Sequence, residues 1–125
     1  MNGKNVNSLI IKILGAKPIA FNPELGRLVK SATAGLFMSQ ILYWWDKGYR
    51  KDCIHKTIKA FEEETCLTRS EQSTAIRKWK ELGVLEVKRM QIPQTRHFFL
   101  NQDKLIKLLE DQAKKRGLEG HYVKK

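Results

Sequence analysis

The sequence predicts a mainly α-helical domain with a small β-hairpin, which is an α+β fold. Residues 32–45 (ATAGLFMSQILYWW) carry no charge and are apolar around most of a helical circumference, as in a buried helix. Thr68 is followed three residues later by Glu71, a pair that is typical of a helix start. Residues 84–90 alternate between apolar and polar side chains, and a turn containing Pro93 separates them from a second apolar segment, 97–100. The length of 125 residues suits one domain.

The N-terminal part of the chain predicts one ambiguous segment and two helices. Residues 9–14 (LIIKIL) fit either a strand or one turn of helix, because so short a run shows no clear period. Asn22, Pro23 and Glu24 form an N-cap, a proline at the first helical position and an acidic first turn, so we expect a helix over residues 23–29. We expect the helix over residues 32–45 to form the centre of the core.

The next part predicts two helices joined by a tight turn, then a hairpin and a last helix. Residues 52–56 fit a short strand. Thr57 can begin a helix that extends through Cys66. The buried side of this helix would consist of Ile58, Phe61, Thr65 and Cys66. The helix after Thr68 should extend to about residue 82, with an inner side made of Ile76, Trp79 and Leu82. Strands over 84–90 and 97–100 form the hairpin, and Asn101 or Asp103 begins a helix that ends by Gly117.

This order of elements is the layout of a winged helix-turn-helix, a DNA-binding architecture. We therefore assign such a domain to residues 31–111. Residues 1–30 would form an N-terminal arm with a short helix, and residues 112–125 a basic C-terminal tail.

The charge of the chain points to a polyanionic partner, and we expect double-stranded DNA. Lys and Arg number 24 against 13 Asp and Glu, which gives a formal net charge of +11. Residues 1–30, 69–96 and 112–125 each carry a net charge of +4, whereas residues 31–68 are neutral. The middle basic segment is the informative one, because it coincides with the predicted second helix and the hairpin.

The composition argues against several other classes of protein. No apolar run approaches the roughly 18 residues that span a bilayer, and Lys12 interrupts the N-terminal apolar stretch, which makes it a poor signal peptide. Cys53 and Cys66 are too few for a disulfide scaffold, so we expect free thiols in a reducing, cytoplasmic compartment. The His and Cys spacings match no metal site, and no acid, base and nucleophile converge. We therefore expect no catalysis, no cofactor and no membrane partner.

Candidate DNA contacts lie on the helix after Thr68 and on the hairpin. Small polar and basic side chains on the outer side of this helix would let it enter the major groove and read base edges; they are Arg69, Ser70, Ser73, Thr74 and Arg77. Lys78 and Lys80 would contact phosphate or solvent. Basic side chains that flank the hairpin tip would hold the neighbouring DNA backbone, namely Lys88, Arg89 and Arg96, with Gln94 and Thr95 in the tip.

Several strings in the chain resemble a winged-helix family of phage and plasmid replication initiators and replisome organisers, of the DnaD-like N-terminal type. They are a P-x-L segment at 23–25, SQILYW at 39–44, the segment 57–68 that leads into the recognition helix, and IRKWKELGVLEV at 76–87. The similarity spans roughly residues 18–109. It implies origin recognition in the replication of a phage, plasmid or mobile element in the cytoplasm of a bacterial host cell, with host or phage replication proteins as further partners.

Other roles fit the same fold, and three questions stay open. The chain could instead be a transcriptional repressor of the same kind of element or a winged-helix protein–protein adaptor. The apolar segments 9–14 and 105–109 are candidates for a homodimer interface, which we expect, or for packing within the domain. Gln72 stands where the family usually has an apolar residue, so either the recognition helix is rotated by about one position or Gln72 has a polar partner.

Overall fold

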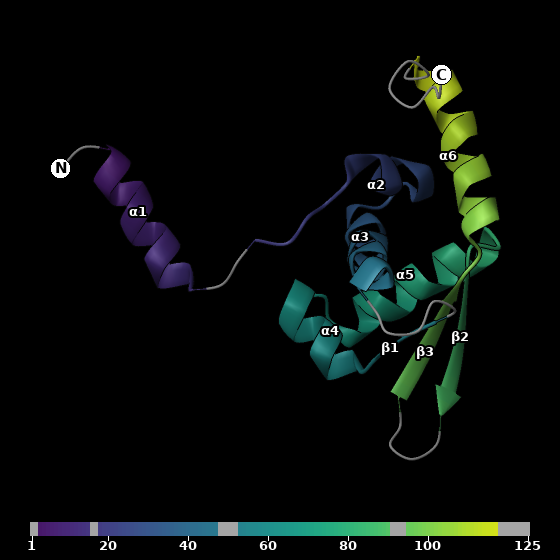
Figure 1. Ribbon diagram of the computed structural model, residues 1–125, viewed down its shortest axis with the longest axis horizontal. Helices are drawn as coiled ribbons and strands as arrows, with labels where there is room; N and C mark the ends of the chain where they lie inside the picture. The colour runs from purple at the N-terminus through teal and green to yellow at the C-terminus, as the bar shows by residue number, and fades with distance from the viewer. Residues whose placement is uncertain (1–2, 16–17, 48–52, 91–94, 118–125) are drawn as a thin grey trace.

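The computed structural model describes residues 3–15, 18–47, 53–90 and 95–117. In these ranges, helices and strands follow in the order α1 (Gly3–Leu14), α2 (Pro23–Val29), α3 (Ala32–Lys47), β1 (Ile54–Lys56), α4 (Ile58–Thr65), α5 (Arg69–Glu81), β2 (Leu85–Met90), β3 (Thr95–Leu100) and α6 (Gln102–Arg116) (Figure 1). The strands form one small antiparallel sheet. This confirms the mainly helical α+β class. No helix among the described residues has the length and apolar character needed to cross a membrane.

α3 lies at the centre of the core, as expected. Its side chains Phe37, Met38 and Ile41 are fully buried. The Phe37 ring stacks on Phe61 of α4, with ring centroids 4.6 Å apart, and meets Phe98 of β3 edge to face at 5.7 Å. α3 therefore joins the helices and the sheet into one apolar cluster.

α2 and α3 approach each other closely at two glycines. A Cβ atom added to Gly35 would lie 2.5 Å from the backbone N and Cα atoms of Gly26. Because backbone atoms cannot turn aside as side chains do, only glycine fits at position 35 in this packing. Asn22 caps α2 as predicted, and its side-chain oxygen accepts a hydrogen bond from the backbone N–H of Glu24 at 3.0 Å.

α4 and α5 begin at the two predicted caps. The Thr57 side chain accepts a hydrogen bond from the backbone N–H of Ala60, and Thr68 forms a complete capping box with Glu71. The predicted burial of Cys66 is wrong, because its side chain is exposed. At Cys66 the backbone is left-handed, with a φ of 60°, so helical spacing no longer determines where its side chain points.

Three buried side chains on one side of α5, Gln72, Ala75 and Trp79, hold this helix against the core. The indole N–H of Trp79 donates a hydrogen bond to the backbone carbonyl of Ala34 in α3 at 2.9 Å. Ile76 and Leu82, also expected on the inner side, are half-buried. Since the inner side is held by these contacts, the opposite side of α5 faces solvent.

The sheet has the strand order β1–β3–β2, with β3 paired antiparallel to both neighbours. β2 and β3 are the two strands of the predicted hairpin, and β1 is the short strand expected over residues 52–56. Phe98 of β3 pairs with Ile54 on one side and with Val87 on the other. This row faces α3 and α4, because the Phe98 ring contacts Phe37 and Phe61.

α1 and α6 form the two ends of the described chain, and α6 has its C-cap at Gly117, the predicted limit of the last helix. Residues 9–14 lie in α1, which stands apart from the other helices in Figure 1, and their side chains are exposed. α6 continues to Arg116, so the expected boundary before residue 112 falls inside a helix. Gln112 donates a hydrogen bond to the backbone carbonyl of Glu24 at 2.8 Å, and Arg116 forms an ion pair with the Glu24 carboxylate. The last turn of α6 therefore packs on α2.

Candidate nucleic-acid interface

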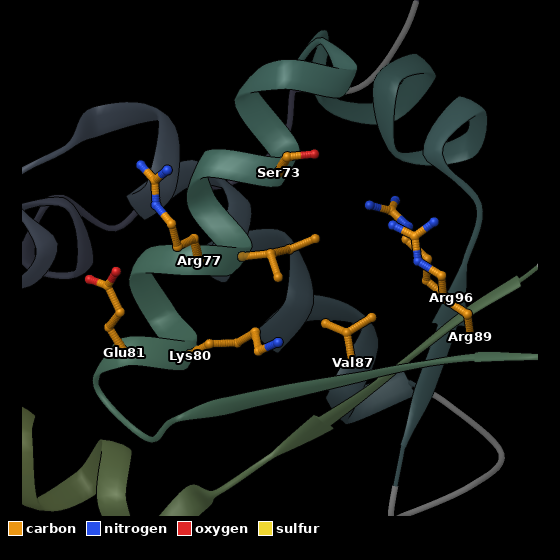
Figure 2. A pocket seen from close by; sticks show the side chains of 8 residues that line it. Ser73, Arg77, Lys80, Glu81, Val87, Arg89 and Arg96 are labelled. Atoms are coloured by element: carbon orange, nitrogen blue, oxygen red, sulfur yellow. The ribbon is translucent and has the colours of Figure 1, made fainter.

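A groove of about 520 Å³ lies between α5 and the β2–β3 hairpin. Figure 2 shows α5 on one side of it and the strands on the other; its lining consists of Ser73, Ile76, Arg77, Lys80, Glu81, Val87, Arg89 and Arg96. The lining side chains include four cations and one carboxylate, that of Glu81. The groove is therefore strongly cationic, and a polyanion would be attracted to it.

The outer side of α5 has the side chains that the sequence placed there. Exposed positions are Arg69, Ser70, Ser73 and Arg77, whereas Thr74 and Lys78 are half-buried. The hydroxyl side chains at positions 70 and 73 are short, so the backbone of α5 is accessible between the two arginines. A helix of this shape can lie close to the edges of bases.

Gln72 is fully buried, and it resolves the question of the helix rotation. Its Nε2 donates hydrogen bonds to the backbone carbonyls of Ile58 at 3.1 Å and Leu67 at 2.9 Å, and its Oε1 accepts one from Nη2 of Arg96 at 2.7 Å. Of the two alternatives left open by the sequence, the structure shows the polar partner. α5 is not rotated, and the outer side keeps its expected residues.

Arg96 is buried, in contrast to the exposed position expected for a side chain flanking the hairpin tip. Only 5% of the residue is exposed. Besides the bond to Gln72, its Nε donates to the backbone carbonyl of Lys56 at 3.3 Å, and its guanidinium lies 5.1 Å from the centre of the Phe98 ring. Burial lowers the pKa of Arg96 to about 10, and the charges of Arg89 and Arg69 act in the same direction. The Arg96 side chain points toward the core because it lies on the same face of β3 as Phe98.

Three cations stand side by side across the sheet at the level of Arg96. Lys56 of β1 and Arg89 of β2 are both register partners of Arg96, so the three side chains project from the same face. Like charges placed directly opposite each other repel. The Glu64 carboxylate pairs with Lys56, but no carboxylate forms an ion pair with Arg89 or Arg96 among the residues that the structure describes.

Glu64 neutralises Lys56 at the β1 end of this row of three cations. It accepts hydrogen bonds from Nε2 of Gln40 at 2.8 Å and Nε1 of Trp44 at 2.6 Å, in addition to its contact with Lys56. Burial raises the pKa of Glu64, but the three hydrogen bonds and the charge of Lys56 together leave this pKa below its ordinary value. The uncompensated positive charge is therefore confined to the α5 end of the row.

Lys88 lies on the opposite face of the sheet from Arg89. Successive strand residues alternate in direction, and Lys88 pairs with His97, whose partner across β1 is His55. The ammonium of Lys88 lies 5.2 Å from the centre of the Phe99 ring. The three basic residues expected to act together at the hairpin thus have three different settings: Arg89 is exposed beside the groove, Arg96 is buried and Lys88 faces away.

The hairpin tip and two further lysines complete the comparison with the expected site. Gln94 lies outside the described residues, whereas Thr95 is half-buried and begins β3. Lys80, expected like Lys78 to contact phosphate or solvent, lines the groove and lies seven residues after Ser73 on one side of α5. Lys59 of α4 lines a second cavity near Arg89. No local signal in the sequence identifies it, because the approach of α4 to the hairpin is a tertiary contact.

Among the described residues, no group of three or more His, Cys, Asp or Glu side chains could hold a metal ion. Comparisons of the chain with models of protein families, with curated proteins and with solved structures found no match.

Proposed function

We propose that this chain is a winged helix-turn-helix protein that binds double-stranded DNA at specific sequences. α4 and α5 would form the helix-turn-helix, with α5 in the major groove, and the β2–β3 hairpin would form the wing beside it. The observation that carries this proposal is the cationic groove between α5 and the hairpin, in which Arg89 and Arg96 have no carboxylate partner among the described residues.

The outer side of α5 supports sequence-specific reading. Arg77 is exposed on the same outer side as Ser70 and Ser73. An arginine can donate two parallel hydrogen bonds to the O6 and N7 atoms of guanine, and serine can contact any base edge. The contacts between Trp79 and α3 hold α5 rigidly, so these side chains are presented in a fixed register.

The charge distribution supports attraction to the DNA backbone. Arg89 at the hairpin and Lys80 on α5 stand on opposite sides of the groove. Cations in such positions bind phosphates and release counterions, which gives affinity that falls steeply with salt. They position the protein on the duplex, whereas contacts with base edges select the sequence.

We further propose that the bound sites lie at a replication origin of a phage, plasmid or mobile element in a bacterial cytoplasm. The support is the resemblance of residues 23–25, 39–44 and 76–87 to replication initiators. A homodimer on repeated sites and contacts with host or phage replication proteins belong to this proposal.

Duplexes selected from a random pool by the wild-type protein provide the test. Fluorescence anisotropy then compares affinity for the selected duplex with affinity for a scrambled one. We expect Arg77→Gln to reduce this discrimination by about tenfold, because one bidentate contact with a base contributes about 1–3 kcal/mol. Arg27→Gln is the matched control, since Arg27 is an exposed arginine on α2 away from the groove.

Two results would contradict the proposal. One is the lack of measurable duplex affinity at low salt, and the other is equal discrimination by Arg77→Gln and wild type. Footprinting on the source element separates the replication role from repression. We expect iterated sites at an origin, and a single operator within a promoter would refute the replication role.

A further inference from the structure

A second cavity, of about 280 Å³, lies where the start of α4, the start of α5 and the end of the hairpin meet. Its lining consists of Thr57, Ile58, Lys59, Arg69, Arg89, Thr95 and Arg96. Four of these residues are cations and none is acidic. Arg89 and Arg96 also line the groove described above, whereas Lys59 and Arg69 line only this cavity.

The buried cation at this cavity has no negative partner among the described residues. The hydrogen bonds described for Arg96 use two of its five N–H groups, and both acceptors, Gln72 and the Lys56 carbonyl, are uncharged. Buried charges in proteins are ordinarily paired with an opposite charge. Arg89 lies directly across the ladder from Arg96, and Arg69 lines the same cavity, so the nearest charges add to the repulsion.

The start of α4 adds a further attraction for a negative group. Thr57 is its N-cap, and the first N–H groups of a helix have no acceptor within the helix. These groups carry partial positive charge, which favours an anion. This contribution is small beside that of the four side chains.

The volume and the chemistry of the cavity together indicate the kind of ligand. A cavity of about 280 Å³ has room for a small anion together with its hydrating water. Guanidinium groups match tetrahedral phosphate oxygens through paired N–H donors. A single phosphate group fulfils both conditions.

We propose that this cavity, the phosphate pocket, binds one phosphate group through Arg69, Arg89 and Arg96, with Lys59 at its edge. The bound phosphate supplies the negative charge that Arg96 lacks. The inference deepens the proposed function and rests on it for one source of the ligand, a phosphate of the DNA backbone. Free inorganic phosphate offers the same oxygens and is the other source.

The chain offers two matched pairs of variants that separate the phosphate pocket from the groove. Arg69 and Arg77 are both exposed arginines of α5, but Arg69 lines only the phosphate pocket and Arg77 only the groove. Lys59 and Lys80 are both exposed helical lysines and divide in the same way. Replacement by glutamine removes the charge and keeps most of the length of the side chain.

The first experiment titrates inorganic phosphate into the full chain at constant ionic strength, with sodium chloride as the replaced salt. The readouts are the thermal midpoint and the NMR shift of the Arg96 Nε–H group. We expect a saturable response in wild type, Arg77→Gln and Lys80→Gln. Arg69→Gln should weaken phosphate binding about tenfold, and Lys59→Gln about two- to fivefold, because the exposed lysine contributes less. A wild-type response that does not saturate, or equal responses of Arg69→Gln and Arg77→Gln, would overturn the proposal.

The second experiment measures duplex affinity over a range of salt concentrations and identifies the source of the phosphate. If the pocket holds a backbone phosphate, Arg69→Gln weakens selected and scrambled duplexes alike and lowers the salt slope by about one. If Arg69→Gln weakens only inorganic phosphate, the pocket still binds phosphate, but the source is the free ion. Wild-type duplex binding without any phosphate response overturns the pocket and leaves the proposed function standing. Phosphate binding without duplex binding overturns the proposed function and leaves the phosphate pocket standing.

Discussion

Gln72→Leu should destabilise the fold, although leucine has a similar volume and more apolar surface. The buried amide donates to the carbonyls of Ile58 and Leu67 and accepts from the guanidinium of Arg96. Leucine can replace none of these hydrogen bonds, and water has no access to a site that is fully buried. The substitution therefore leaves a buried cation and two buried carbonyls with one partner fewer each.

The size of the effect follows from these three bonds. Each bond to a neutral carbonyl contributes about 1 kcal/mol, and the bond to the guanidinium about 1.5–3 kcal/mol. Burial of the leucine side chain returns about 1–2 kcal/mol. The net loss in the free energy of unfolding should be about 1.5–4 kcal/mol, which lowers Tm by about 6–16 °C for a chain of this size.

Unfolding in guanidinium chloride checks this prediction. Gln102→Leu is the control, because Gln102 is exposed at the start of α6, and its effect should stay within about 0.5 kcal/mol. A double-mutant cycle with Arg96→Met should give a coupling energy of at least about 1 kcal/mol. Stability of Gln72→Leu equal to wild type, or strict additivity in the cycle, would refute the reasoning.

Three further predictions concern the packing, the pH dependence and the capping of the fold. Gly35→Ala should lower the free energy of unfolding by about 2 kcal/mol, because its Cβ would lie 2.5 Å from backbone atoms of Gly26, an overlap that outweighs the helix propensity of alanine. Gly26→Ala, whose Cβ would come no closer than 3.4 Å to another group, should change stability by less than about 1 kcal/mol; similar losses in both variants would contradict this view of the contact. The pKa of Glu64 lies below its ordinary value of 4.5, so its contribution is present above that pH and is lost as pH falls through the lower folded value. The stability gap between wild type and Glu64→Gln, measured by urea unfolding, should therefore shrink below about pH 4.5, and a gap independent of pH would exclude this role. Thr68→Ala should cost about 1 kcal/mol through loss of the capping box, whereas an unchanged Tm would show that the cap adds nothing to α5.

Local signals in the sequence predicted the start of three helices and the orientation of α5. The caps at Asn22, Thr57 and Thr68 involve atoms only two or three residues apart, so no tertiary contact is needed to identify them. Trp79 was correctly expected inside, and this one large side chain sets the phase of the helix. The exposure of Arg77 on the other side follows from that phase.

Contacts distant in sequence account for what the sequence did not predict. Arg96 is 24 residues from Gln72, and nothing near it in the sequence distinguishes it from an exposed basic residue beside a turn. Lys59 reaches the phosphate pocket only because α4 packs near the hairpin. The sequence of residues 9–14 fits a helix or a strand equally well. In the structure these residues lie in α1 with exposed side chains, so no packing against the core produces a clear helical or strand pattern in the sequence.

The contact of α6 with Glu24 has a mechanical consequence. Figure 1 shows α2 and the last turn of α6 at the top of the view, above α3 and the sheet, and hydrogen bonds and an ion pair join them. A force that pulls residues 22 and 117 apart would therefore act on the exposed ion pair between Arg116 and Glu24 before it acted on the buried side chains of α3. The ion pair and the hydrogen bond from Gln112 should break first, which separates the end of α6 from α2. A fluorophore or surface tether attached near residue 22 or 117 would likewise lie away from the groove between α5 and the hairpin.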